Sequence, residues 1–265
     1  MSDRLKGKVV FVTGAGSIGS GWGNGKAAAV QFAREGGQVF IIDKNSDALE
    51  ETKKIILDEN NIVQSIPCDV THAQSVKEAV KKCMDSFGRI DVLHNNVGII
   101  DPGGPEDLSE DQWDNLMKTN IKSMYLTCRH ILPIMTKQGK GSIINISSIA
   151  STHSLGYSCI SYSASKGAVN SFTRDIALNY GPKGVRCNSI LPGLMNTPLI
   201  HSGNVTEVYG STEEMVRQRD SLVPLGKMGD GFDVAHAAVF LASDESKHIT
   251  GIELVIDGGI TLKVK

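Results

Sequence analysis

Short apolar runs alternate with longer amphipathic stretches along the whole chain. The apolar runs are Val9–Val12, Val39–Ile42, Leu93 with its neighbours, Ile143–Ile146, Val185–Leu191 and Leu254–Ile256. They are continuous, as expected for parallel strands that are buried on both faces. Helices with one buried face are expected between them, at Asp47–Asp58, Ala73–Phe87, Asp111–Met135, Ala164–Tyr180 and Phe232–Ala242. This repetition predicts an α/β fold with a doubly wound parallel β-sheet flanked by helices.

No internal repeat, low-complexity segment or linker divides the 265 residues. We therefore expect a single domain over residues 1–265, a size that one α/β domain commonly reaches. Hydrophobic residues make up 40% and charged residues 21% of the chain, as is usual for a globular protein with one buried core. The net charge of −2, without any basic stretch, argues against nucleic acid as a partner.

The cysteines give no sign of a metal site or of a disulfide framework. They are five in number and widely scattered, and no two have Cys-x-x-Cys spacing, so a reducing compartment fits best. The apolar stretch near the amino terminus is too short for a signal peptide, and no run reaches the length of a transmembrane helix. We expect a cytoplasmic protein that does not bind a membrane.

A glycine-rich loop, TGAGSIGSGWGNGKAAA, follows the first apolar run and spans Thr13–Ala29. Its first three glycines match the dinucleotide pattern G-x-G-x-x-G. A helix that began at the third, Gly19, would contain three more glycines in its first two turns, each costing about 1 kcal/mol relative to alanine. The helix is therefore expected to begin near Asn24–Gly25.

This placement assigns the glycines different tasks. Gly23 and Gly25 lie at the amino end of the helix, where Asn24 also lies and where free N–H groups favour a phosphate. Gly14 makes the sharp exit from the strand. The segment Ala15–Trp22 becomes an enlarged flap shaped by Gly16, Gly19 and Gly21. Trp22 covers the cofactor or, as we favour, packs against its own sheet, while Lys26 faces away from the phosphates.

Polar residues follow several of the predicted strands. Asp43 ends the second strand, where a carboxylate can accept both hydroxyls of an adenosine ribose and so favour NAD over NADP. Its alternative role is to cap the next helix, which Ser46 could do instead. Asp69 with Val70, and Asn96 with Gly98, follow later strands. Because ligands bind at the carboxyl ends of parallel strands, we expect all four to line a cofactor site.

Candidate chemistry lies in NISS, which ends at Ser148, and in SYSASKGA, which contains Tyr162 and Lys166. Residues four apart on a helix share one face, so the lysine ammonium lies near the tyrosine. A nearby positive charge lowers the pKa of a phenol and makes it a usable acid or base. Ser148 can donate to a substrate oxygen, whereas Ser147 should point to the other side of its strand.

Taken together, these motifs resemble the short-chain dehydrogenase/reductase family over nearly the whole chain. The family order is present as the glycine loop, Asp69-Val70, NNVG at Asn95–Gly98, Asn120 in KTNIKS, the NISS serine, Tyr162 and Lys166, RCNSILPG at Arg186–Gly193, and Thr197. The resemblance implies a Rossmann fold, a nicotinamide cofactor contacted also by Pro192, Gly193 and Thr197, and a homotetramer. The longer glycine loop is similar to that of divergent enoyl reductases, which space their tyrosine and lysine differently.

The resemblance also implies how the site works. Tyr162 is the general base for alcohol oxidation, Ser148 steadies the substrate oxygen, and Lys166 lowers the tyrosine pKa and holds the nicotinamide ribose. Asn120 binds a water that links Lys166 to solvent, or alternatively is a buried polar residue that bonds the backbone. We expect NAD as the cofactor and a secondary alcohol or its ketone as the substrate. Other chemistry on the same scaffold (enoyl reduction, epimerisation or dehydration) and a non-catalytic dinucleotide sensor are the alternatives.

The substrate pocket should lie between the segment before Tyr162 and the segment after Gly193. His153, Leu155, Tyr157 and Cys159 come from the first, with Ile100–Pro105 as another wall. His153 and Tyr157 are the expected substrate contacts, although His153 could equally face solvent. No arginine or lysine is evident in this set, which favours a neutral, moderately hydrophobic substrate. Residues 195–222 are expected to form a mobile lid over cofactor and substrate.

Overall fold

Parallel strands form one sheet at the centre of the protein. The computed structural model describes residues 3–201 and 204–263, and within these ranges the sheet has seven strands in the order β3-β2-β1-β4-β5-β6-β7. The strands are β1 (Val9–Thr13), β2 (Gln38–Asp43), β3 (Val63–Pro67), β4 (Val92–Asn95), β5 (Gly141–Ile146), β6 (Val185–Pro192) and β7 (Glu253–Ile256). The chain reverses its direction of winding between β1 and β4, where ligands bind in such sheets.

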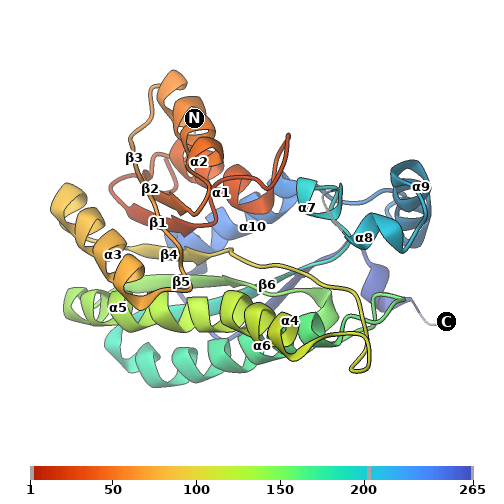
Figure 1. Ribbon diagram of the computed structural model, residues 1–265. Coiled ribbons are helices and arrows are strands. Elements are labelled where there is room, and N and C mark those ends of the chain that lie inside the picture. Colours follow the sequence, from red (N-terminus) through yellow and green to blue (C-terminus); the bar gives the residue numbers. More distant parts are fainter. Residues whose placement is uncertain (1–2, 202–203, 264–265) are drawn as a thin grey trace.

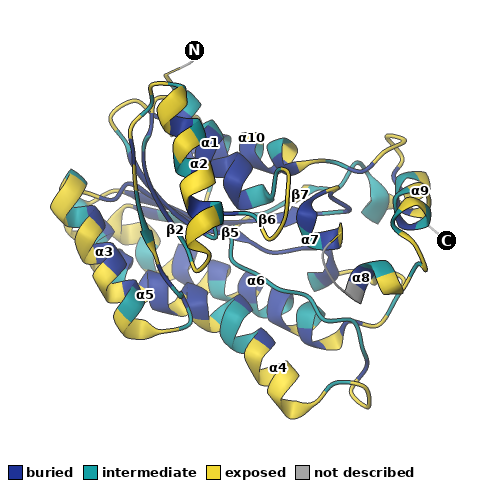
Figure 2. Cartoon of the chain, turned by 45° about the horizontal axis from the view of Figure 1, so that its top comes forward, coloured by how far each residue is buried: buried dark blue, intermediate teal, exposed yellow. Residues whose placement is uncertain are grey.

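Helices cover both faces of the sheet (Figure 1). One face carries α1 (Asn24–Arg34), α2 (Ser46–Asp58) and α10 (Gly231–Ala242), and the other carries α3 (Ala73–Phe87), α4 (Glu110–Met117), α5 (Ser123–Gln138) and α6 (Ile160–Tyr180). Each layer has its own apolar cluster against the sheet, built around Phe32 on one side and Phe11 on the other. Figure 2 shows the buried residues concentrated along the strands and the inward helix faces. The predicted single-domain, doubly wound Rossmann fold is confirmed.

Two elements differ from the sequence prediction. Strand β3 reads VQSIP and is only partly buried, so it carries no apolar run by which it could be recognised. It pairs only with β2, at the edge of the sheet. The helix expected over Asp111–Met135 is divided by a π-helical turn at Lys118–Lys122. This turn contains Asn120, so the irregularity falls at a predicted site residue.

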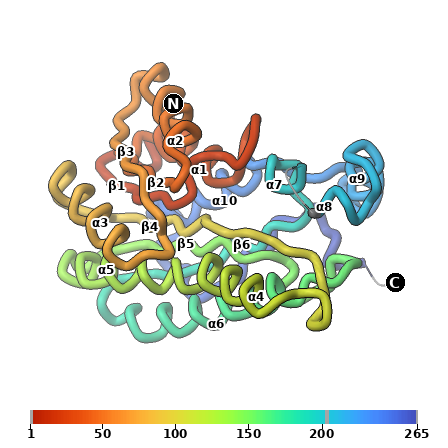
Figure 3. Tube along the Cα trace, viewed as in Figure 1, coloured from red at the N-terminus to blue at the C-terminus, as the bar shows by residue number. Residues whose placement is uncertain are grey.

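Within the segment 195–222, the described residues form three short helices at the carboxyl end of the sheet, beside the glycine loop (Figure 3). They are α7 (Pro198–His201), α8 (Asn204–Glu207) and α9 (Thr212–Leu222). A separate apolar cluster that includes Ile200, Val205 and Met215 holds this segment together. Residues 202 and 203 of the predicted lid lie outside the described residues. Across the described ranges, every helix is too short or too polar to span a membrane.

Candidate active site

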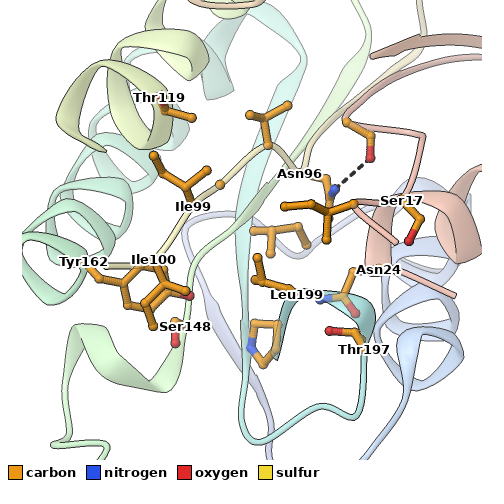
Figure 4. Close-up of a pocket in the computed structure, with 18 of the residues that line it drawn as sticks. Ser17, Asn24, Asn96, Ile99, Ile100, Thr119, Ser148, Tyr162, Thr197 and Leu199 are labelled. Atoms are coloured by element: carbon orange, nitrogen blue, oxygen red, sulfur yellow. Dashed lines mark hydrogen bonds between the residues drawn. The ribbon is translucent and has the colours of Figure 1, made fainter. Parts of the chain in front are cut away.

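A cavity of about 470 Å³ lies at the carboxyl ends of the central strands, within the range typical of small-molecule sites. Most of the predicted site residues line it: Gly14, Gly23, Asn24, Gly25, Asp43, Asp69, Val70, Asn96, Gly98, Ser148, Tyr157, Tyr162, Lys166, Pro192, Gly193 and Thr197. Figure 4 shows Tyr162 and Ser148 close together on one side and Ser17, Asn24 and Thr197 on the other. Asn120 and His153 are not part of the lining.

The glycine loop has the geometry expected for close approach to a ligand. Helix α1 begins at Asn24 with Gly23 as its cap, as predicted. Gly14 has φ +65°, which favours glycine. A Cβ on Gly25 would lie 2.0 Å from the carbonyl oxygen of Gly14 and 2.3 Å from the amide nitrogen of Asn96. Gly25 is thus needed for packing of the loop against the helix, in addition to any contact with phosphate.

Two buried polar atoms in this loop lack a partner among the described residues: the hydroxyl oxygen of Ser17 and the side-chain oxygen of Asn24. Ser17 lines the cavity, and its hydroxyl can donate to a phosphate of a dinucleotide, as can the free N–H groups of α1. The side-chain oxygen of Asn24 can accept from a hydroxyl of the same ligand. The sequence analysis missed Ser17. Its signal was a hydroxyl inside a glycine loop directly before a helix.

The rest of the flap packs against neighbouring elements. Cβ atoms on Gly19 and Gly21 would lie 3.7 and 3.6 Å from Pro198, so the flap reaches the first helix of the 195–222 segment. The ring of Trp22 lies 4.9 Å from that of Phe232 on α10, which supports the packing role. Lys26 pairs with Glu51 at 2.6 Å and lies outside the cavity lining, as expected.

Asp43 is held rigidly at the far end of the cavity. One carboxylate oxygen accepts from the backbone N–H of Gly16 at 3.0 Å, and the other accepts from that of Asn45 at 2.9 Å. The cap of α2 is Asn45, whose side chain accepts from two backbone N–H groups. The expectation that Ser46 could take this role is therefore wrong, because the helix begins at Ser46 itself, one residue earlier than a Ser46 cap requires. Asp43 is left to position the glycine loop and to face the cavity.

Ser148, Tyr162 and Lys166 meet where β5 ends against α6. Burial raises the pKa of Tyr162, and a hydrogen bond with Ser148 acts in the opposite direction. Burial lowers the pKa of Lys166 to about 8, and its ammonium donates to the carbonyl oxygen of Ile146 at 2.9 Å. The expected lowering of the tyrosine pKa is not found, because desolvation raises this pKa more than the Ser148 hydrogen bond and the charge of Arg219 lower it. Ser147 donates to the carbonyl oxygen of Lys166 and also lines the cavity, so it does not turn away from the site as the sequence suggested.

Asn120 is fully buried in the π-helical turn. Its amide nitrogen donates to the Ile99 carbonyl oxygen at 2.9 Å and to the Ser165 hydroxyl at 3.0 Å. Its side-chain oxygen accepts from the backbone N–H of Ile99 at 2.8 Å. This is the alternative role, a buried polar residue that bonds the backbone. The two N–H donors of the side chain are thus used within the protein, while its oxygen accepts one hydrogen bond and can accept a second, so the water link to Lys166 stays a prediction.

The substrate end of the cavity differs from the expectation in several ways. Cys159 is not part of the cavity lining, and of the wall expected at Ile100–Pro105 only Ile100 lines the cavity. His153 is exposed and contacts the Thr152 hydroxyl, so the structure does not place it against the cavity. Arg219 of α9 does line the cavity and is only 5% exposed. The expected absence of a cation near the substrate is therefore wrong, because Arg219 lines the same cavity as Tyr157 and Tyr162. The remaining wall is apolar, with Ile100, Leu155, Leu194, Leu199, Ile200 and Val205.

Comparisons with known proteins define the class. A family model described as enoyl-(acyl carrier protein) reductase matches residues 19–261. A 2,5-dichloro-2,5-cyclohexadiene-1,4-diol dehydrogenase, LinX, of Sphingobium indicum is 39% identical over 264 residues, covering 100% of both chains. The chain belongs to the short-chain dehydrogenase/reductase family and is an oxidoreductase of that family.

Solved structures agree with this assignment. A protein from Burkholderia xenovorans that is described as a short-chain dehydrogenase/reductase has a TM-score of 0.93 and 40% identity, covering 100% of both chains. Carveol dehydrogenase from Mycobacterium avium, solved in complex with NAD, has a TM-score of 0.92 and 25% identity, covering 99% of this chain and 100% of that one. A nicotinamide dinucleotide is thus the cofactor class of the family.

Proposed function

We propose that this protein is an NAD-dependent oxidoreductase that interconverts a secondary alcohol and its ketone, with Tyr162 as general acid and base. The observation that carries the proposal is the convergence of Ser148, Tyr162 and Lys166 on one cavity with the glycine loop and Asp43. Such an arrangement joins a proton-transfer group to a dinucleotide site within a single space. The alcohols named for LinX and carveol dehydrogenase support the same reaction class.

The residues divide the chemistry between them. In oxidation, the Tyr162 phenolate takes the proton of the substrate hydroxyl while hydride leaves the carbon that carries this hydroxyl. The nicotinamide ring supplies the hydride acceptor when it is bound. Ser148 donates to the substrate oxygen and stabilises the charge that develops on it. Lys166, with its pKa of about 8, remains an ammonium at neutral pH and would stabilise the negative charge that develops on the Tyr162 oxygen during proton transfer.

The preference for NAD rests on Asp43. Its carboxylate lies at the cavity and can accept the two ribose hydroxyls, whereas it repels the 2′-phosphate of NADP. Lys44 also lines this end and offsets part of the repulsion.

Enoyl reduction is the second candidate, because the matching family model carries that description. An enoyl reductase adds hydride to a carbon–carbon double bond, so it would consume reduced cofactor with an α,β-unsaturated thioester. The purified protein can therefore be incubated with NAD and a panel of secondary alcohols, and with NADH and matched ketones or an enoyl thioester, while the absorbance of NADH is followed. Turnover confined to the enoyl thioester would overturn the proposal, as would no turnover with any of them.

A further inference from the structure

Arg219 is a buried cation at the substrate end of the cavity, and no described residue forms an ion pair with it. Its side chain is 5% exposed, and the one hydrogen bond it makes among the described residues runs from Nε to the sulfur of Met228 at 3.4 Å. A thioether is a weak acceptor, so this contact does little to balance a guanidinium. Asp220, its neighbour in sequence, instead accepts from the backbone N–H of Met228.

Acidic residues do occur in the cavity lining, but they lie elsewhere. Among the described lining residues these are Asp43 and Asp69, of which Asp43 holds the glycine loop and Asp69 accepts from Thr71 and pairs with His72 at 3.1 Å. Asp43 is the last residue of β2 and Asp69 follows β3, and the ion pairs given for the described residues join neither of them to Arg219. No carboxylate of the described chain therefore neutralises Arg219.

The guanidinium lies close to the reacting groups. Burial raises the pKa of Tyr157 to about 12, and the charge of Arg219 acts against this rise. The same charge acts on Tyr162, where burial and the Ser148 hydrogen bond are the larger influences. Apolar side chains such as Leu155 and Val205 line the same region. The cavity thus combines a hydride-transfer site, an apolar wall and a cation.

A guanidinium cannot lose its charge at accessible pH, and burying it without an anion is costly. We propose that Arg219 binds a carboxylate of the substrate, so that the substrate is a hydroxy acid or the corresponding oxo acid. The planar fork of the guanidinium matches the two oxygens of a carboxylate. This inference rests on the proposed function and names the substrate class for the same site. A carboxylate substrate differs from the neutral, moderately hydrophobic substrate that the sequence alone favoured.

Binding of simple carboxylates tests the role of Arg219 without requiring turnover. The NAD-loaded protein is titrated with butanoate and pentanoate and with their neutral amides, and dissociation constants are measured by calorimetry. We expect the wild type to bind a carboxylate more tightly than its amide. Arg219→Gln should weaken the affinity for the carboxylate roughly 30-fold or more. Arg217→Gln is the matched control, because Arg217 lies on the same helix but is exposed and paired with Glu214. It should bind like the wild type.

Two further readouts exclude other roles for Arg219. If Arg219 bound the cofactor phosphates, Arg219→Gln would weaken the affinity for NAD, and this result would overturn the proposal. If its role were structural, Arg219→Met would lower the melting temperature of the ligand-free protein. We expect an unchanged or higher melting temperature, because the variant removes an unpaired buried charge. Failure of the wild type to prefer any carboxylate over its amide would also overturn the proposal.

Turnover separates this inference from the proposed function. The wild type is assayed with NAD and 3-hydroxybutanoate, 4-hydroxypentanoate, their amides and 2-butanol. We expect the acids to be preferred by wild type and Arg217→Gln, and the preference to be lost in Arg219→Gln. Oxidation of the amides and 2-butanol as fast as the acids would overturn the inference and leave the proposed function standing. Carboxylate binding that depends on Arg219, with no oxidation of any alcohol, would support the anion site and contradict the proposed function.

Discussion

The ammonium of Lys166 lies 5.5 Å from the centre of the Tyr162 ring. Both groups lie on one face of α6, and desolvation shifts their pKa values apart, raising that of the phenol and lowering that of the amine to about 8. The charged forms of both are therefore disfavoured by the protein alone. The activity that they support should therefore depend on pH, because the reaction needs Tyr162 and Lys166 in particular protonation states.

This relationship predicts a pH dependence for ketone reduction. Reduction requires Tyr162 in its protonated form, which its raised pKa secures through the neutral range. Lys166 is charged below its pKa of about 8 and loses that charge above it. We expect kcat/KM for reduction to be level below pH 8 and to fall above it, by up to about tenfold per pH unit. A profile that stays level up to pH 10 would contradict the assigned role of Lys166.

Cofactor preference should follow the charge of Asp43. We expect the wild type to favour NAD over NADP by about 1.5–3 kcal/mol, or roughly tenfold to a hundredfold in kcat/KM, because two charges near 4 Å repel one another. Asp43→Asn removes the charge but keeps an oxygen that can accept from the N–H of Gly16. This variant should reduce the difference in kcat/KM between NAD and NADP. Asp43→Ser loses that oxygen, so the affinity for both cofactors should fall. A wild type that favours NADP would contradict the assignment.

The sequence predicted most of the fold and most of the cavity lining, because both depend on local patterns. Buried parallel strands give continuous apolar runs, and their carboxyl ends fix where polar residues converge. Arg219 could not be predicted in this way. It lies 57 positions beyond Tyr162 in a segment without strands, so only the packing of α9 over the cavity brings it to the site. The hydrogen bonds of Asn120 likewise depend on a π-helical turn, which the spacing of apolar residues in the sequence does not predict.

The segment 195–222 should close over bound ligands. Its helices are short and rest on a small apolar cluster of their own, and Pro198 contacts the glycine flap. We expect hydrogen exchange to show low protection here in the free protein and higher protection with NAD, with α6 as an internal reference of constant protection. Equal protection of the segment in both states would argue against a lid.

The protein is expected to be a homotetramer. The helices α4, α5 and α6 expose the large apolar side chains Trp113, Tyr125 and Leu178, the last at 77%. Light scattering of the wild type should give four times the monomer mass, and Leu178→Arg should lower it. Leu57→Arg on α2, where the leucine is 48% exposed, is the control that should leave the assembly intact. A monomeric wild type at micromolar concentration would rule the tetramer out.

The central claim is that Tyr162 transfers the proton, and the most direct test is the turnover of Tyr162→Phe on the best substrate, measured together with its dissociation constant for NAD. The variant removes one hydroxyl from a buried ring and leaves the glycine loop and Asp43 unchanged. We expect kcat to fall by about 10²–10⁴ while the affinity for NAD stays near that of the wild type. Turnover within a few-fold of the wild type would contradict the mechanism.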